Sequence, residues 1–349
     1  MKIAILGGGH GCYAAAADLA EAGHQVRLWR RDAAALQAVV DTGAIVLKDA
    51  QGTREVPIAL ATADIALALR DAALVVIPSP ATAQGDIART MAPHLTASQT
   101  VFLAPGTFGS YVMARIVRDT GNTADVAWAE TGTLPYLARK HGAREVNITV
   151  RAVRLPTGVY PARSADAALA VIREAYPSVH GCGDALSGAL MNAAPLQHFA
   201  SWDIHNEGTQ ASVRAVTDRL DHERIAVREA LGYGGPHFPL AHHYASEGEQ
   251  WMYGRGSHDR LTDSGDWRER IVLTEHRYMR EDLRLGLSFL VSAAGLAGVA
   301  TPLARAFLAI GGTICGEDFM QNGRTLASLG LGQLARGELQ ALLRDGFVR

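Results

Sequence analysis

The sequence has few cysteines, no excess of charge of one sign and no long apolar run that glycine or proline leaves unbroken. Its 349 residues carry a formal net charge of −2, and no basic run interleaves with aromatic residues. Nothing in the composition therefore favours a nucleic-acid partner. The three cysteines, Cys12, Cys182 and Cys315, form neither a metal-binding spacing nor a disulfide framework, which predicts a reducing, cytoplasmic location.

A membrane-spanning segment is also missing. Leu287–Ala304 carries no charge and is about long enough to span a bilayer, but Gly295, Gly298 and the Thr301-Pro302 step interrupt it. This pattern favours a buried helix that ends before Pro302 and another that starts near it. The apolar run at the N-terminus is broken by glycine and lacks a signal-peptide cleavage pattern. We therefore expect no membrane partner.

What the sequence does have is a glycine cluster between a strand and a helix. Lys2–Leu6 reads as a buried parallel strand, Tyr13–Ala22 as an alanine-rich helix, and Gln25–Trp29 as a second strand. This order is the opening βαβ unit of a dinucleotide fold. The alternative is a glycine turn that binds no ligand.

The glycine positions suit a pyrophosphate, which binds backbone N–H groups at a helix N-terminus where no Cβ holds it away. Gly7 allows the tight turn and Gly9 the close approach, while Cys12 stands where the third glycine of GxGxxG is expected. Read one step along, Gly9, Gly11 and Ala14 also fit the pattern. The turn predicts a cofactor-binding set of Gly7, Gly9, His10, Gly11 and Cys12.

The end of the second strand predicts which dinucleotide binds. An acidic residue there holds the ribose hydroxyl of NAD, whereas arginine accommodates the 2′-phosphate of NADP. The strand ends in Trp29-Arg30-Arg31-Asp32. Because two guanidiniums suit a phosphate dianion, Arg30 and Arg31 favour NADP over NAD. Asp32 leaves NAD open, since its carboxylate is able to reach the ribose.

Strand and helix patterns alternate to about residue 180 and predict a doubly wound α/β Rossmann domain over residues 1–183. Further strand ends at Pro78–Pro80, Pro105–Thr107 and Glu130–Tyr136 are expected to line the same crevice, which adds Ser79 and Pro80 to the cofactor set. From Asp184 onward strand signals nearly vanish, so residues 184–349 are predicted to form an all-α substrate and catalytic domain. Its expected helices are Ala185–Asn206, Ser212–Leu231 and Arg268–Ala294, and the segment Gly232–Asp266 reads as a loop, lid or short packed helices.

Several motifs resemble those of the opine dehydrogenase family. They are Glu130–Tyr136 (ETGTLPY), Asn192–His198 (NAAPLQH), Asn206–Gly208, Thr217–Leu231, His276–Asp282 (HRYMRED) and Gly298–Pro302. The resemblance implies an NAD(P)H-dependent enzyme that reduces the imine formed between a 2-oxo acid, commonly pyruvate, and the amine of an amino acid. It implies His198 as catalytic acid and base, Asp282 as its carboxylate partner, Arg277 as anchor of a substrate carboxylate, and Thr133 near the oxo acid.

The sequence departs from the family pattern at a few places. Ala194 stands where Asn is usual before Pro195, Phe199 where Pro is common, and Ala138 where Cys is frequent. These changes affect the expected amine specificity more than the reaction. His205 is the nearest rival of His198, since residues seven apart share a helix face. Arg277 and Asp282, five apart, would point about 140° from one another on a straight α-helix.

Reduction of an imine between two carboxylate-bearing substrates requires the same residue types. Histidine exchanges protons near neutral pH, a neighbouring carboxylate orients it, and a guanidinium binds a substrate carboxylate. Glu281 and Arg280 are the rival carboxylate and cation, and Glu281 and Arg277 also fit an ordinary surface pair. His237, His242 and His243 lack a carboxylate or cysteine that would complete a zinc pattern. We therefore expect no metal.

Two other functions remain open. A 2-oxo acid or ketone reductase of the related superfamily, such as ketopantoate reductase, usually relies on a lysine in its helical domain, but no lysine follows Asp184 here. A non-catalytic NADP-binding sensor would have no reason to keep an acid, a base and a carboxylate anchor together. The Gly- and Ala-rich region Leu287–Ile310 is a candidate subunit interface, and we expect a homodimer.

Overall fold

The fold is taken from a computed structural model, which describes residues 1–191, 200–203 and 205–347. Contacts divide the chain into two compact units, Met1–Gly188 and Ala189–Arg349. The domain boundary predicted from the sequence lies between residues 183 and 184. His198 lies outside the described residues.

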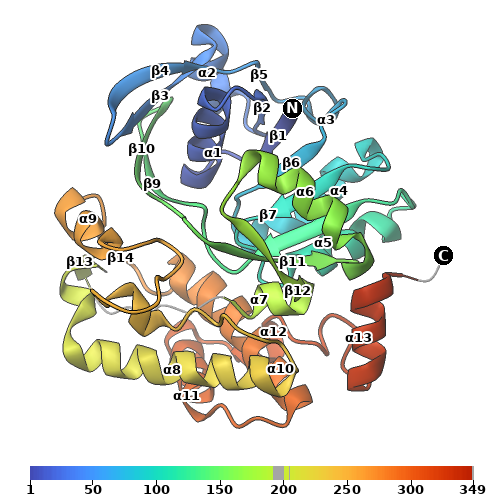
Figure 1. The fold of residues 1–349 in the computed structure, drawn as a ribbon, viewed down its shortest axis with the longest axis vertical. Helices are drawn as coiled ribbons and strands as arrows, with labels where there is room; N and C mark the ends of the chain where they lie inside the picture. The colour runs from blue at the N-terminus through green and yellow to red at the C-terminus, as the bar shows by residue number, and fades with distance from the viewer. Residues whose placement is uncertain (192–199, 204, 348–349) are drawn as a thin grey trace. The chain divides into compact units, whose positions relative to one another are not determined.

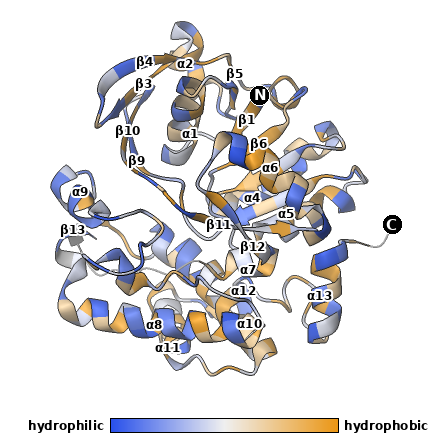
Figure 2. Cartoon of the chain, viewed as in Figure 1, coloured by the Kyte–Doolittle hydropathy of each residue, from blue (hydrophilic) through white to orange (hydrophobic). Residues whose placement is uncertain are grey.

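The first unit is built on an eight-stranded sheet with the strand order β12-β11-β8-β7-β6-β1-β2-β5 (Figure 1). All neighbours pair in parallel except β11 and β8. Because helices cover the faces of such a sheet, its strands are apolar along their length, as β1 and β6 are in Figure 2. The strands are β1 (Lys2–Leu6), β2 (Gln25–Trp29), β5 (Leu60–Thr62), β6 (Leu74–Ile77), β7 (Thr100–Leu103), β8 (Ala127–Thr131), β11 (Leu155–Tyr160) and β12 (Val179–Asp184).

The run β5-β2-β1-β6-β7-β8 is the strand order of a doubly wound dinucleotide fold. The chain order reverses between β1 and β6, where a crevice opens beyond the carboxyl ends of the strands. The predicted Rossmann class is therefore confirmed. Its helices are α1 (His10–Glu21), α2 (Gln37–Thr42), α3 (Ile65–Leu69), α4 (Gln84–Met91), α5 (Gly109–Asp119), α6 (Ala165–Ala175) and α7 (Ala185–Ala189).

A second sheet of four strands covers α1 on its outer side. It has the order β4-β3-β10-β9, from β3 (Ala44–Asp49), β4 (Gly52–Pro57), β9 (Tyr136–His141) and β10 (Glu145–Arg151). Helix α1 packs against strands of both sheets, and its residues from Cys12 to Ala17 are fully buried. The run of alanines is explained by this position, because small side chains allow both sheets to approach the helix.

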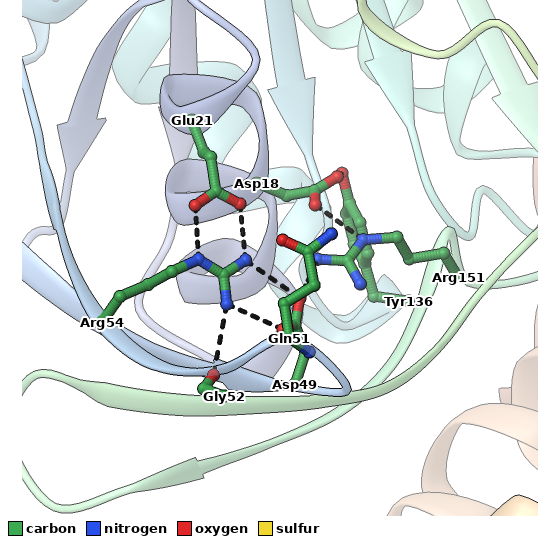
Figure 3. Close-up of polar contacts among 8 residues, drawn as sticks. All are labelled: Asp18, Glu21, Asp49, Gln51, Gly52, Arg54, Tyr136 and Arg151. Carbon is green, nitrogen blue, oxygen red and sulfur yellow. Dashed lines mark hydrogen bonds and ion pairs between the residues drawn. The ribbon is translucent and has the colours of Figure 1, made fainter.

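An ionic network fastens the second sheet to α1 (Figure 3). Arg54 of β4 binds Glu21 of α1 through two nitrogens and Asp49 of β3 through Nη1 at 2.7 Å. Arg151 of β10 joins the same network at 2.7 Å from both Asp18 and Asp49. The Asp49 side chain is only 1% exposed. Its two guanidinium partners therefore compensate a carboxylate that has lost its water.

The second unit is mainly helical. It contains α8 (Ala211–Ala230), α9 (Ser257–Ser264), the π-helix η7 (Tyr278–Leu287), α10 (Ser288–Ala297), α11 (Pro302–Cys315), α12 (Phe319–Asn322) and α13 (Arg336–Asp345). Pro302 begins α11 as predicted, since its missing N–H costs nothing at a first helical position. No helix among the described residues is long and apolar enough to cross a membrane.

Two predicted helices are partly wrong. In the stretch predicted to be helical from Ala185 to Asn206, α7 ends at Ala189 and β13 occupies Ala200–Asp203. In the stretch Arg268–Ala294, β14 occupies Arg268–Ile271 and pairs antiparallel with β13. Each strand is four residues long, and hydrophobic periodicity does not distinguish such short runs from helix. Pairing between distant segments decides their structure.

Candidate active site

The glycine turn follows β1 at the switch point of the sheet. Gly7 has φ +132°, and a Cβ there would overlap Ser79 Oγ and lie 2.7 Å from Cys12 Sγ. Ser79 donates to the carbonyl of Leu6 at 3.0 Å, which fixes the loop after β6 against the turn after β1. The absence of a side chain at Gly7 is therefore required by close packing between two strand ends.

Helix α1 begins beyond the turn with Gly9 as its N-cap. A Cβ at Gly9 would meet no atom within 4 Å, so this position faces open space, whereas Gly11 lies against the Pro78 carbonyl. Cys12 is fully buried, and desolvation raises the pKa of its thiol. It fills the space between the helix and the loop after β6, at the position of the third glycine of the GxGxxG pattern. His10 Nδ1 accepts the backbone N–H of Lys140 at 2.8 Å.

A pocket of about 300 Å³ lies over this turn. Its lining includes most of the residues predicted to bind the cofactor, and it extends along α4 to residues that the sequence reading missed. The lining residues are Gly7, Gly8, Gly9, Trp29, Arg30, Arg31, Asp32, Ser79, Pro80, Ala83, Asp86, Ile87 and Thr90. A sequence signal for Asp86 and Thr90 was available. They lie on the first helix after the Pro78–Pro80 step, and a helix that follows a strand end begins at the edge of the sheet where the ligand binds.

The arginine pair lines one wall of the pocket. Arg30 lies over Gly8, where a Cβ would be 2.6 Å from its Cδ, and it donates to the Ala35 carbonyl at 3.1 Å. Arg31 is 80% exposed and lies 3.8 Å from Asp86, a weak pair that leaves its guanidinium facing solvent. Asp32 Oδ1 accepts the backbone N–H of Ala35. The Asp32 carboxylate is thereby partly used in the local turn.

Arg277 and Asp282 lie on one short stretch of the second unit. Arg277 is the N-cap residue directly before η7, and Asp282 is the fifth residue of that helix. In a π-helix the hydrogen bonds reach five residues along the chain, so residues i and i+5 lie on about the same side. The separation of about 140° expected for an α-helix is thus wrong, because the helix type differs. The two side chains are electrostatically coupled, since each shifts the pKa of the other.

The Asp282 side chain is half-buried, and one of its carboxylate oxygens is covered by protein. Its Oδ2 atom has no accessible surface and no hydrogen-bond partner among the described residues. Desolvation raises the pKa of Asp282 to about 6, although Arg277 and His276 oppose the rise. Arg277 is exposed, as a carboxylate anchor would require.

The rival Arg280 is already engaged. It donates to Glu317 Oε1 at 2.6 Å and to the Thr274 carbonyl at 2.7 Å, which ties η7 to the segment after α11. His276 is a neighbour that the sequence reading did not single out. Its Nε2 lies 3.5 Å from Glu269 and its ring lies 4.3 Å from that of Tyr278.

The motif around Thr133 belongs to the first unit. Thr133 lies between β8 and β9 and is half-buried. Glu130, fully buried at the end of β8, accepts the backbone N–H groups of Phe108 at 2.7 Å and Ser110 at 2.8 Å. This carboxylate organises the loop between β7 and α5. In the sequence, Glu130 stands out only as the first residue of the motif Glu130–Tyr136.

Two known protein families match this chain, one in each half. The family described as NAD/NADP octopine/nopaline dehydrogenase, alpha-helical domain, matches residues 186–315. The family described as NAD-dependent glycerol-3-phosphate dehydrogenase N-terminus matches residues 2–125. Together the two matched segments contain the glycine turn, Arg277 and Asp282.

Relatives match over most of their length. The opine dehydrogenase of Arthrobacter sp. (strain 1C) is 28% identical over 97% of both chains, and the vitopine synthase of Allorhizobium ampelinum is 26% identical over 77% of both. The structure of an octopine dehydrogenase with NADH and L-arginine superposes with a TM-score of 0.74 at 16% identity. It covers 100% of this chain and 99% of that one, which is a likeness of fold.

Proposed function

The chain belongs to the opine dehydrogenase family, and on this basis we propose that it is an NAD(P)H-dependent opine dehydrogenase. The reaction joins a 2-oxo acid of the pyruvate class to the amine of an amino acid, or runs in reverse. Condensation releases water and forms a C=N bond. A hydride then adds to the carbon and a proton to the nitrogen, which gives a secondary amine.

The first unit fits a dinucleotide. The turn Gly7–Gly9 opens a helix N-terminus to a phosphate, and a Cβ at Gly9 would enter the open space over the turn. When bound, the reduced nicotinamide supplies the hydride. We propose that Gly7, Gly9, His10 and Gly11 cradle the pyrophosphate, while Ser79 and Pro80 form the opposite wall beside Cys12.

The second unit supplies charge and proton chemistry. We propose that Arg277 binds a substrate carboxylate and that His198 gives the proton to the imine nitrogen, or takes it in reverse. Asp282 would hold the imidazole tautomer and favour the imidazolium, and its Oδ2 has no other partner among the described residues. Thr133 is proposed to contact the oxo acid. The single observation that carries this proposal is a partly covered carboxylate beside an arginine on one π-helix, within the segment matched to the family.

The experiment is NADPH and NADH oxidation with pyruvate or glyoxylate and a panel of amino acids and amines. Oxidation only when oxo acid and amine are both present is the expected result. Oxidation with the oxo acid alone would instead assign a reductase that forms a hydroxy acid. Tight cofactor binding without turnover on any pair would favour the NADP-binding sensor.

We propose NADP as the preferred cofactor. Arg30 and Arg31 line the pocket where a ribose 2′-phosphate would lie, and one oxygen of Asp32 already accepts the Ala35 N–H. Comparison of kcat/KM for the two cofactors tests this preference. A higher value with NADH would overturn it.

We also propose a homodimer and a cytoplasmic location. Helix α11 exposes Ile310 and Ile314, four residues apart on one face, at 54% and 39%. Among the described residues no disulfide involves Cys12, Cys182 or Cys315, as expected in a reducing compartment. Light scattering of the purified chain and of an Ile310→Glu variant tests the dimer, which the charged side chain should dissociate.

A further inference from the structure

Three histidines from separate segments converge in the second unit. His205 follows β13, His243 ends the 3₁₀ helix η6 (Leu240–His243), and His258 is in α9, which lies beside the β13–β14 ribbon in Figure 1. One ring nitrogen from each lies within 4.8 Å of the other two. In the sequence, His237, His242 and His243 are the histidines that suggest a metal site. The fold brings His243 together with His205 and His258 instead, and these three lie too far apart in the chain to form a recognisable spacing pattern.

Aromatic rings surround this cluster. The His243 ring lies 4.8 Å from Trp251, the His205 ring 4.9 Å from Trp267, and the His258 ring 5.1 Å from Tyr244. His243 is buried at 9% exposure and the other two are half-buried. Such a shell limits the access of water to the imidazole nitrogens.

Burial leaves two imidazole nitrogens of the cluster poorly satisfied by hydrogen bonds. The Nδ1 atom of His258 is buried without a hydrogen-bond partner among the described residues, and that of His243 has only Ser257 Oγ at 3.4 Å. An unsatisfied buried nitrogen is costly, and a cation would satisfy it.

Charged groups of both signs face the cluster. Asp203, 3% exposed, accepts the backbone N–H of His205 at 2.9 Å, and both Asp203 and Asp259 favour positive charge at His258. Arg214 opposes it, but its guanidinium is stacked 4.3 Å over the Tyr244 ring. The carboxylates and the guanidinium thus act on His258 in opposite directions, and Arg214 has a larger effect than either carboxylate.

We propose that His205, His243 and His258 bind a divalent transition-metal ion of the Zn²⁺ class, with a fourth position for water or a small ligand. Zinc–nitrogen bonds of ~2.0–2.1 Å in a tetrahedral site separate the nitrogens by about 3.3 Å, so the rings must close by up to about 1.5 Å. Rotation of the side chains supplies such a movement. Mg²⁺ and Ca²⁺ are poor candidates because they prefer oxygen ligands. The ion would tie β13, η6 and α9 together and fix the segment Gly232–Asp266.

The test uses the full chain after dialysis against a chelator. Addition of Co²⁺ should give the visible absorption of a tetrahedral cobalt centre at one equivalent, and Zn²⁺ should displace it. The variants His243→Gln and His258→Gln should each weaken binding at least tenfold. His242→Gln, which changes the adjacent histidine of η6 outside the cluster, should bind as the unchanged chain does.

Thermal unfolding gives an independent measurement that does not depend on the variants. Zn²⁺ should raise the Tm of the unchanged chain and of His242→Gln, and a chelator should reverse the rise. Absence of both the cobalt absorption and the Tm shift in the unchanged chain would overturn the proposal. Equal binding by His242→Gln, His243→Gln and His258→Gln would overturn it as well, since the metal would then lie elsewhere. Neither readout requires turnover, so failure of the proposed reaction would leave this test intact.

Discussion

Arg224 and Asp221 form an ion pair of 2.6 Å inside the second unit, and their side chains are 2% and 3% exposed. Arg224 also donates to the His237 carbonyl at 2.8 Å, and Asp221 accepts the Leu240 N–H at 2.8 Å. The pair therefore connects α8 to the segment that leads into η6. Because both charges have lost water, each depends on the other for compensation.

Replacement of Arg224 alone should lower the free energy of unfolding more than replacement of Arg224 and Asp221 together. Arg224→Met leaves the Asp221 carboxylate buried without its cation, and we expect a loss of about 3–5 kcal/mol in unfolding free energy. The double variant Arg224→Met/Asp221→Leu should recover part of that loss. Urea unfolding of the chain measures both, with the exposed Arg219→Ala as a control that stays near the unchanged value. Equal losses in the single and double variants would contradict this account.

The ionic network around Asp49 should make the first unit sensitive to acid. Arg54 and then Arg151 hold the pKa of Asp49 well below its usual range. A depressed pKa contributes stability that is present above the unfolded value of ~3.9 and is lost as pH falls below it. Asp49→Asn should therefore lose about 2 kcal/mol at pH 7 and show a flatter decline below about pH 4. Thermal unfolding from pH 7 to pH 3 checks this.

A matched control is available at the exposed pair Lys2–Asp71, where the aspartate side chain is 69% exposed. Asp71→Asn should leave the acid limb of the stability curve unchanged, since exposed pairs contribute little. If Asp49→Asn retains the acid sensitivity of the unchanged chain, other carboxylates govern it.

The first βαβ unit could be predicted from sequence because its signals are local. A strand, a glycine turn and a helix follow one another directly, and the structure places Gly7 and Ser79 in contact at the switch point. The strands β13 and β14 could not be found in this way, because their pairing joins distant segments. The π-helix η7 was also missed, since the pattern of apolar residues does not distinguish it from an α-helix. The convergence of His205, His243 and His258 arises from tertiary folding alone.

The arginine pair makes the cofactor preference testable. Loss of a charge-assisted hydrogen bond of about 1.5–3 kcal/mol corresponds to roughly tenfold or more in affinity. Arg30→Ala and Arg31→Ala should therefore raise the KM for NADPH by about tenfold or more and change that for NADH little. Arg163→Ala removes a guanidinium that pairs with Asp125 outside the pocket lining and should change neither. Parallel loss of both cofactors would contradict the phosphate role.

The two glycines of the turn should respond differently to alanine. At Gly7 the new Cβ would overlap Ser79 and enforce an unfavourable backbone at φ +132°, so Gly7→Ala should lower the Tm without any ligand. At Gly9 the Cβ would enter open space, so Gly9→Ala should keep the Tm within a few degrees but weaken cofactor binding. Differential scanning fluorimetry and titration of NADPH measure the two effects. If Gly7→Ala and Gly9→Ala lower the Tm equally, the contrast between a packing role for Gly7 and a cofactor-binding role for Gly9 is wrong.

Replacement of Asp282 by asparagine should raise the stability of the protein and lower its activity. Its raised pKa of about 6 means that the folded protein binds a proton more tightly than the unfolded chain does. The stability that this proton provides is present below pH ~4 and is lost as pH rises through about 6. Asp282→Asn removes the cost of a buried charge, so it should be more stable at pH 7 by up to about 3 kcal/mol. It should also lose most of the imine-reducing activity, because the proposed partner of His198 is gone.

Two measurements separate these effects. Urea unfolding at pH 7 and pH 4.5 should show that the gain in Asp282→Asn shrinks as the pH falls. The profile of kcat against pH reports the proton-transfer group, and Glu281→Gln, which changes the adjacent carboxylate, should retain that profile. Loss of activity in Glu281→Gln but not in Asp282→Asn would transfer the proposed role to Glu281. An active and stabilised Asp282→Asn would mean that the Asp282 carboxylate serves neither the reaction nor the fold.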